Sequence, residues 1–276
     1  MQAEQSLREG RLQEALAELQ AQVRKEPANA KYRIFLFQLL AVLGQWERAS
    51  NQLNVLEEMD PESLPMVQTY REALRCELLR AEVFAGRRSP LIFGDPEPWM
   101  ALLLEALQLT AGGHHAQAQT ARDQAFEGAA TTSGTLDGQP FEWLADADPR
   151  LGPMLEAVIN GRYYWVPWQR IRTLALEQPS DLRDYVWMPA GFTWANGGEV
   201  VGLIPSRYPG SQASADPQVQ LGRRTEWLEQ ESGIYLGIGQ RMLATEQNEY
   251  PLLDIRRIDL AVPEAASPAT TDSDDG

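Results

Sequence analysis

Two closely spaced carboxylates, Asp146 and Asp148, are the residues with the clearest potential for chemistry. Such a pair can bind a divalent cation or act as a general acid and base. The sequence Asp148-Pro149-Arg150 is instead typical of a residue that caps and fixes a loop. We therefore predict no catalytic residue and no metal site. The alternative is an enzyme or metal-binding protein with a site around Asp146, Asp148 and Arg183. Metal bound to the purified protein would favour this alternative.

Other chemical motifs are incomplete. His114 and His115 are the only histidines and follow two glycines, so we expect them in a solvated turn rather than in a catalytic triad or a metal site. The segment Gly237 to Arg241 begins like a dinucleotide-binding loop but lacks the third glycine, and no P-loop lysine motif occurs. The sequence thus predicts no cofactor.

Composition narrows the class of partner. The net charge of -15 disfavours nucleic acid and anionic membranes, because both require clustered Lys and Arg. The first ten residues lack the pattern of a signal peptide, and no apolar run of membrane-spanning length occurs. A single cysteine, Cys76, suits a reducing compartment. We expect a cytoplasmic protein.

The elements that would position these residues begin with a repeat of 34 residues. It carries a turn glycine, an alanine at a close helix crossing and a proline at a helix end. The two copies are Gly10, Ala15, Pro27 and Gly44, Ala49, Pro61. This period is typical of the tetratricopeptide (TPR) helix-turn-helix unit.

A third, irregular copy places Gly113 and Ala118 after an apolar helix expected at 99–109. Between copies two and three, apolar spacing predicts one long helix at 65–85, followed by a proline-rich crossing at 87–99. Residues 1–130 are therefore predicted to form a TPR-like α-α superhelix, and we expect its binding groove to form without the rest of the chain.

The second half has the pattern of a small antiparallel β domain. Asn196-Gly197 between two apolar runs predicts a hairpin, and further strands are expected at 163–166, 234–243 and 252–260. One helix is predicted at 153–160. Short strands at this spacing suggest a strongly bent sheet or barrel over 131–262. Residues 263–276, poor in apolar side chains and rich in acids, are predicted to be a disordered acidic tail.

Arginine and aromatic residues form the remaining feature of this half. They can build the core of a small domain or anchor a protein interface. The candidates for a C-terminal interface are Arg162, Trp165, Arg183, Trp187, Arg207, Tyr208 and Trp227.

Several second-half motifs resemble those of a known family. They run through 141–153 (FEWLADADPRLGP), 161–167 (GRYYWVP), 181–187 (DLRDYVW), 204–210 (IPSRYPG), 224–227 (RTEW), 237–241 (GIGQR) and 254–256 (DIR). These motifs resemble the ImpE/TagJ (SciE-type) family of bacterial type VI secretion. The likeness extends from the first helix to about Leu260.

The resemblance implies a TPR-like N-terminal part and an SH3-like barrel in the C-terminal part. It also implies a non-enzymatic adaptor that binds the N-terminal amphipathic helix of the small contractile-sheath subunit. A link between the sheath and the AAA+ ATPase that disassembles it is a further implication. The resemblance supplies no binding residues. A structural baseplate component held in a permanent assembly is the rival scaffold role.

Helical spacing supplies candidates for the partner contact. The first helix of a TPR unit lines a concave surface that can accept an amphipathic helix. In the second repeat, one stripe of that helix carries Lys31, Ile34, Gln38 and Val42. We predict that these residues bind the partner.

Overall fold

The computed structural model describes residues 2–230 and 233–261. The predicted acidic tail at 263–276 lies outside the described residues. Among the described residues, seven α-helices lie before residue 130. Their bounds are α1 (Gln2–Arg8), α2 (Leu12–Lys25), α3 (Ala30–Val42), α4 (Trp46–Met59), α5 (Leu64–Phe84), α6 (Pro98–Ala111) and α7 (His115–Gly128). Within the described residues, no helix is both long and apolar enough to span a bilayer.

The helical repeat forms as the spacing predicts. Gly10, Gly44 and Gly113 lie between paired helices with φ of 77°, 66° and 78°, a left-handed conformation that glycine adopts without steric cost. The repeat alanines at 15, 49 and 118 are fully buried at the helix crossings. The sequence prediction of a TPR-like helical region is confirmed.

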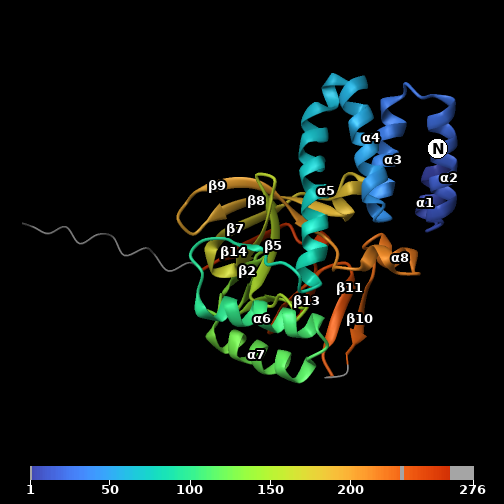
Figure 1. Cartoon of the computed structure of the whole chain (residues 1–276). Helices are drawn as coiled ribbons and strands as arrows, with labels where there is room; N and C mark the ends of the chain where they lie inside the picture. Colours follow the sequence, from blue (N-terminus) through green and yellow to red (C-terminus); the bar gives the residue numbers. More distant parts are fainter. Residues whose placement is uncertain (1, 231–232, 262–276) are drawn as a thin grey trace, which may run out of the picture.

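The third pair of helices does not continue the stack. Figure 1 shows α1–α4 on one side of the long helix α5, whereas α6 and α7 lie beside the sheet, near the C-terminal end of α5. The proline-rich crossing between α5 and α6 contains β1 (Leu91–Ile92), which pairs in parallel with β6. The irregular segment is thus an edge strand of the sheet.

The second half is built around an open nine-stranded sheet with the order β1-β6-β5-β9-β8-β7-β14-β2-β3. The strands after β1 are β2 (Gly134–Leu136), β3 (Gln139–Phe141), β5 (Met154–Ile159), β6 (Arg162–Pro167), β7 (Ile171–Leu176), β8 (Trp187–Trp194), β9 (Glu199–Pro205) and β14 (Arg257–Leu260). The antiparallel, strand-rich half is confirmed. The sheet is not closed, so the expected SH3-like barrel is not found.

Two smaller sheets complete this half. One joins β13 (Glu249–Pro251), β12 (Met242–Thr245) and β4 (Leu144–Asp146), and the other joins β10 (Thr225–Glu229) and β11 (Tyr235–Gly239). The predicted hairpin at Asn196-Gly197 connects β8 and β9. One short α-helix, α8 (Pro217–Gln220), lies between β9 and β10.

The helix predicted at 153–160 is wrong. These residues form β5, in which all six residues are buried. A strand covered on both faces is a continuous apolar run, and its periodicity does not distinguish it from a buried helix. Asn160 and Gly161, both with positive φ, make the two-residue turn into β6.

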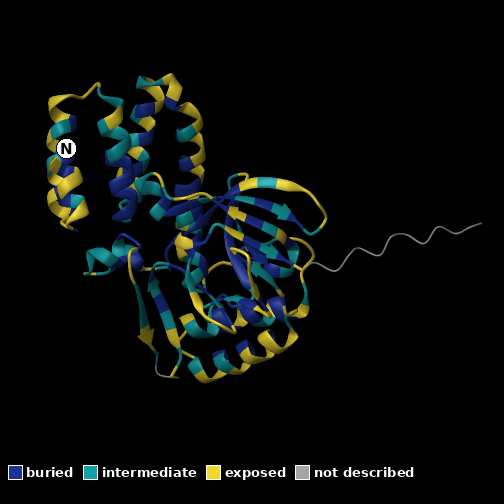
Figure 2. Ribbon diagram, turned by 180° about the vertical axis from the view of Figure 1, so that it is seen from behind, coloured by how far each residue is buried: buried dark blue, intermediate teal, exposed yellow. Residues whose placement is uncertain are grey.

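One of the two clusters of buried hydrophobic residues spans both halves, and the other lies within the β half. Trp187 of β8 lies 6.1 Å from the Trp46 ring and 5.7 Å from the Tyr70 ring, and Trp165 of β6 lies 5.8 Å from Phe84. Figure 2 shows buried residues continuing from the helices into the sheet. The helical half therefore rests on the β half through aromatic side chains rather than through a flexible linker.

Candidate functional site

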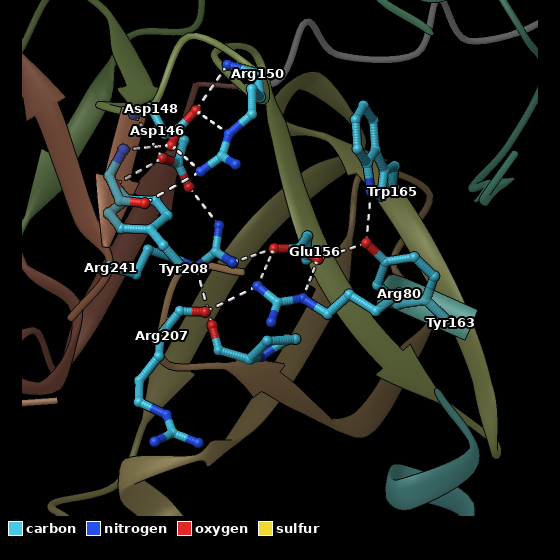
Figure 3. A network of polar contacts seen from close by, with 12 residues as sticks. Arg80, Asp146, Asp148, Arg150, Glu156, Tyr163, Trp165, Arg207, Tyr208 and Arg241 are labelled. Atoms are coloured by element: carbon cyan, nitrogen blue, oxygen red, sulfur yellow. Dashed lines mark hydrogen bonds and ion pairs between the residues drawn. The ribbon is translucent and has the colours of Figure 1, made fainter. Parts of the chain in front are cut away.

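The most concentrated set of charged residues lies inside the molecule, where the halves meet. Arg241 is fully buried between the carboxylates of Asp146 and Glu156 and forms an ion pair with each. Its Nε also donates to the carbonyl oxygen of Pro205 at 2.9 Å. Figure 3 shows the guanidinium lying between the two acids. One cation thus ties together three separate segments of the β half.

Arg80 of α5 extends this cluster into the helical half. Its Nε and Nη2 donate to the two oxygens of Glu156 at 2.6 and 2.8 Å, and Nη2 also reaches the carbonyl oxygen of Arg207. The Tyr163 hydroxyl donates to the same carboxylate. A bidentate pair of this kind is both strong and geometrically demanding. It fixes α5 against β5.

Asp148 has a separate set of partners. Its carboxylate accepts from the backbone and side chain of Arg150 and from the backbone N–H of Gly237. Asp146 accepts from the backbone N–H of Asp148 and from the Tyr208 hydroxyl, both at 2.9 Å. The predicted loop-fixing role of this acid pair matches these contacts.

The two acids bound to Arg241 differ in their electrostatics. Burial raises the pKa of the Glu156 carboxyl, but Arg80 and Arg241 outweigh burial and bring it down to about 2. For Asp146, burial outweighs the attraction of Arg241, and its pKa rises to about 6. Glu156 is therefore the firmly ionised centre of the cluster.

The residues of the alternative enzyme or metal site do not converge. Asp146 and Asp148 are buried and hydrogen-bonded, whereas Arg183 pairs with Asp181 and lies 4.7 Å above the Tyr70 ring. Within residues 2–230 and 233–261, no group of three or more His, Cys, Asp or Glu side chains is arranged to hold a metal ion. The geometry suits a structural clamp.

Most of the predicted C-terminal interface residues lie at the junction of the halves. Trp165, Trp187, Arg207 and Tyr208 are buried, Arg183 contacts α5, Trp227 is partly exposed and Arg162 is exposed. The structure therefore places four of the seven away from solvent. Any contact with another protein through this set would use Arg162, Arg183 or Trp227.

Arg207 joins the halves in an unusual way. Its guanidinium donates to the carbonyl oxygens of Val42 at 2.9 Å and Ala41 at 3.5 Å, at the C-terminal end of α3. A cation is favourable at this negative end of a helix. Burial lowers the pKa of Arg207 to about 10. The β half thus adds a cationic cap to the end of α3, where backbone N–H groups already bond the carbonyl oxygens of Leu39, Leu40 and Ala41.

The four residues predicted on α3 differ in accessibility. Lys31 is exposed and Ile34 is half-buried, but Gln38 and Val42 are buried. The C-terminal half of α3 packs against the 3-10 segment at Leu182–Tyr185. In this structure a partner would reach only the N-terminal part of the predicted stripe.

An open groove runs instead between α4 and α5. It has a volume of about 680 Å³, and its apolar residues are Trp46, Leu74 and Leu78. Leu78 is 56% exposed. At one end Arg71 crosses the groove and pairs with Glu57 at 2.7 Å. A large exposed leucine in a concave surface between two helices is a typical contact point for another protein.

The groove has charges of opposite sign on its two walls. Glu47 lies on the α4 wall and Arg75 on the α5 wall. Neither forms an ion pair with any residue that the structure describes. An occupant that carried a base toward α4 and an acid toward α5 would satisfy both.

Sequence reasoning missed the centre of the buried cluster. Arg241 stands in the quoted GIGQR motif, but Glu156 was hidden by the wrong helix prediction, and Arg80 is one of many helix arginines. It also missed the α4–α5 groove. The available signal was Leu78, an apolar residue between the charged residues of a helix.

Comparisons with known proteins agree with this architecture. A family model described as ImpE protein matches residues 138–259, and a tetratricopeptide repeat model matches residues 6–74. A relative from Pseudomonas aeruginosa, the type VI secretion system accessory component TagJ, is 55% identical over 257 residues, which are 93% of this chain and 90% of that protein.

A solved structure extends the comparison to the whole fold. The crystal structure of protein VPA1032 from Vibrio parahaemolyticus is similar with a TM-score of 0.86 and 25% sequence identity, covering 97% of this chain and 100% of that one. The arrangement of helical and β halves thus recurs at low identity. Because the TagJ relative is so similar over nearly its full length, this chain belongs to the ImpE family.

Proposed function

We propose that this protein is a non-enzymatic adaptor of the type VI secretion system that acts in the cytoplasm. It binds the N-terminal amphipathic helix of the small contractile-sheath subunit and links the sheath to the AAA+ ATPase that disassembles it. Support comes from the relative named as an accessory component and from the match to TPR repeats, which commonly bind other proteins.

The observation that carries the proposal is the open groove between α4 and α5. Its lining runs from Trp46 to Glu57 along α4, about 16 Å at 1.5 Å per residue, or three helical turns. A partner helix of that length would lay its apolar stripe over the exposed Leu78 and the half-buried Trp46. Glu47 and Arg75 would set its direction through charge.

The N-terminal part of α3 is the second surface for the same function. Lys31 and Ile34 remain accessible there, whereas Gln38 and Val42 are enclosed by the molecule itself. A partner helix in this position would contact the two accessible residues only, which gives it less apolar area than the groove provides.

A titration tests the function and separates the two surfaces. The labelled N-terminal helix of the small sheath subunit is added to the full chain and to three variants, Leu78→Asp, Ile34→Asp and Leu64→Asp. We expect Leu78→Asp to weaken binding about a hundredfold, because it removes an apolar contact and desolvates a new carboxylate. Leu64 is exposed on the same helix but lies outside the groove, so its variant is the control.

Each outcome has a distinct meaning. If only Ile34→Asp weakens binding of the sheath helix, the binding site lies on α3 rather than in the groove. If the unaltered chain does not bind the helix, the sheath subunit is not the partner. The ATPase link is tested by adding the ATPase to the complex of chain and sheath subunit. Migration of all three together supports the link, whereas displacement of the sheath subunit contradicts it.

A further inference from the structure

The ribbon formed by β10 and β11 is separate from both larger sheets. Figure 1 shows it at the edge of the molecule beside the helices α6 and α7. A two-stranded ribbon alone is marginally stable in water and usually depends on additional contacts. The two long edges of this ribbon differ in how their backbone groups are satisfied.

The outer edge of β11 is closed by the body of the protein. The Gly237 N–H donates to the carboxylate of Asp148 at 2.8 Å, and its carbonyl accepts from Arg150 at 3.2 Å. The Gly239 N–H donates to the Ser211 hydroxyl at 2.8 Å. Side chains therefore occupy the place where another strand would pair.

The outer edge of β10 is open. Gln230 donates its N–H to the Ile234 carbonyl, so these two residues form a hydrogen-bonded pair. Such pairs occur at every second residue of an antiparallel ribbon, so the backbone groups of Leu228 also point toward β11. The backbone groups of Trp227 and Glu229 accordingly point away from β11. In the part of the chain that the structure describes, no strand pairs with this edge. Free N–H and C=O groups in a row are a template for strand addition.

The side chains of the ribbon define what could pair there. Leu228 is 48% exposed and shares one face of the ribbon with the partly exposed Leu236 and Ile238. Glu226 shares this face but forms an ion pair with Arg224, whereas Glu229 lies on the opposite face with Trp227. An incoming strand would therefore meet apolar side chains on one face of the ribbon and the negative charge of Glu229 on the other.

We propose that the outer edge of β10 accepts an extended segment of another protein, in which apolar and basic residues alternate, as a third strand. Main-chain hydrogen bonds to Trp227 and Glu229 hold the segment, and its basic side chains lie on the face of the ribbon that carries Glu229. A second copy of the chain is disfavoured, because β10 carries no basic residue that could pair with Glu229.

This surface is independent of the α4–α5 groove, from which it differs in both element and chemistry. The groove suits a helix, whereas the ribbon suits an extended segment. An adaptor needs two separate docking surfaces, and these two can be filled at the same time.

Synthetic peptides test the ribbon directly on the full-length protein. The probe is a labelled peptide of alternating Lys and Val. Two controls are a twin with Glu in place of Lys and a twin of unchanged charge whose pairing amides are N-methylated. We expect saturable binding of the probe, at least tenfold weaker binding of both twins, and slower amide hydrogen exchange over 225–229.

Protein variants provide a second arm. Glu229→Pro removes an outward N–H without breaking a hydrogen bond of the ribbon, and Glu229→Gln removes only the charge. We expect at least a tenfold loss of affinity for the proline variant and a smaller loss for the glutamine variant. Equal binding of the probe and the N-methylated twin, unchanged exchange over 225–229, or no binding of the probe would overturn the proposal.

Discussion

Glu156 joins three segments of the chain through its carboxylate. Its two oxygens receive Arg80 from α5, Arg241 from the loop before β12 and Tyr163 from β6. A buried carboxylate is tolerated only when its charge and lone pairs are satisfied. Arg80 and Arg241 both form ion pairs with Glu156, so removing its negative charge leaves buried cations without full compensation.

The first prediction concerns that balance. Glu156→Gln keeps the shape of the side chain but leaves Arg80 and Arg241 with less negative charge. We expect the free energy of unfolding to fall by about 3–5 kcal/mol, the usual cost of breaking a buried pair. Urea unfolding of this variant beside Glu199→Gln, an exposed control on β9, measures the difference. Equal losses in the two variants would contradict a clamp at Glu156.

The second prediction is the pH dependence of the same contact. The pKa of Glu156 is lowered from 4.5 to about 2 on folding, so its stabilisation is present above pH 4.5 and is lost as the pH falls toward 2. The shift corresponds to about 3 kcal/mol. The advantage of the native protein over Glu156→Gln should therefore shrink below pH 4.5. Urea midpoints from neutral to acidic pH test this, and a constant advantage would refute it.

Part of the residue-level picture was accessible from sequence. The loop-fixing role of Asp148 could be predicted because one of its partners, Arg150, lies only two residues away in the chain. The partners of Glu156 are Arg80 and Arg241, 76 and 85 residues away. Local spacing contains no information about such long-range pairs.

At the scale of elements, the turn glycines of the repeat have unequal surroundings. A Cβ on Gly44 would lie 2.3 Å from Cγ of Gln212, whereas a Cβ on Gly113 would meet open space. Both residues have positive φ, so both substitutions strain the backbone. The difference in stability between the two variants therefore measures the contact of the α3–α4 turn with the β half.

The third prediction uses this pair. Gly113→Ala should lower the free energy of unfolding by about 1–2 kcal/mol through backbone strain alone. Gly44→Ala should lose about 1–3 kcal/mol more through overpacking. Adding Gln212→Gly to Gly44→Ala should recover the second part, because both clashing atoms, Cβ and Cγ of Gln212, are then absent. A double-mutant cycle by thermal and urea unfolding measures the coupling, and additive effects would contradict it.

Elements with local signals were predictable, and elements defined by burial were not. The turn glycines of the repeat and the Asn196-Gly197 hairpin have short signatures that the structure reproduces. The strand β5 has none, because burial on both faces removes its alternation. The sheet is open because its edge strands β1 and β3 do not pair with each other, and local patterns do not reveal such long-range pairing.

At the scale of the whole molecule, the division at residue 130 follows a change of pattern rather than a change of core. One cluster of buried residues includes Leu39 and Leu53 of the helices together with Met154, Trp165 and Trp187 of the sheet. Periodicity shows which face of each element is apolar. It does not show which other element covers that face, and this is why the junction could not be placed from sequence.

The last prediction is that the two halves unfold together. Separating them would expose Trp46, Tyr70 and Phe84, remove the carboxylate partner of Arg80 and leave α3 without the cap from Arg207. We therefore expect a fragment of residues 1–130 to lack stable tertiary structure, contrary to the sequence-based expectation that its groove forms without the rest of the chain. In the full chain, the helical circular-dichroism signal and tryptophan fluorescence should show one coincident transition.

Trp187→Ala tests the same coupling from the sheet side. Its ring is fully buried against Trp46 and Tyr70, and its N–H donates to Glu77 at 3.0 Å. Truncation should cost about 3–5 kcal/mol. Because the halves share a core, both spectroscopic signals should shift equally. A helical signal that keeps its midpoint while the sheet melts earlier, or a cooperatively folded 1–130 fragment, would show that the halves are independent folding units.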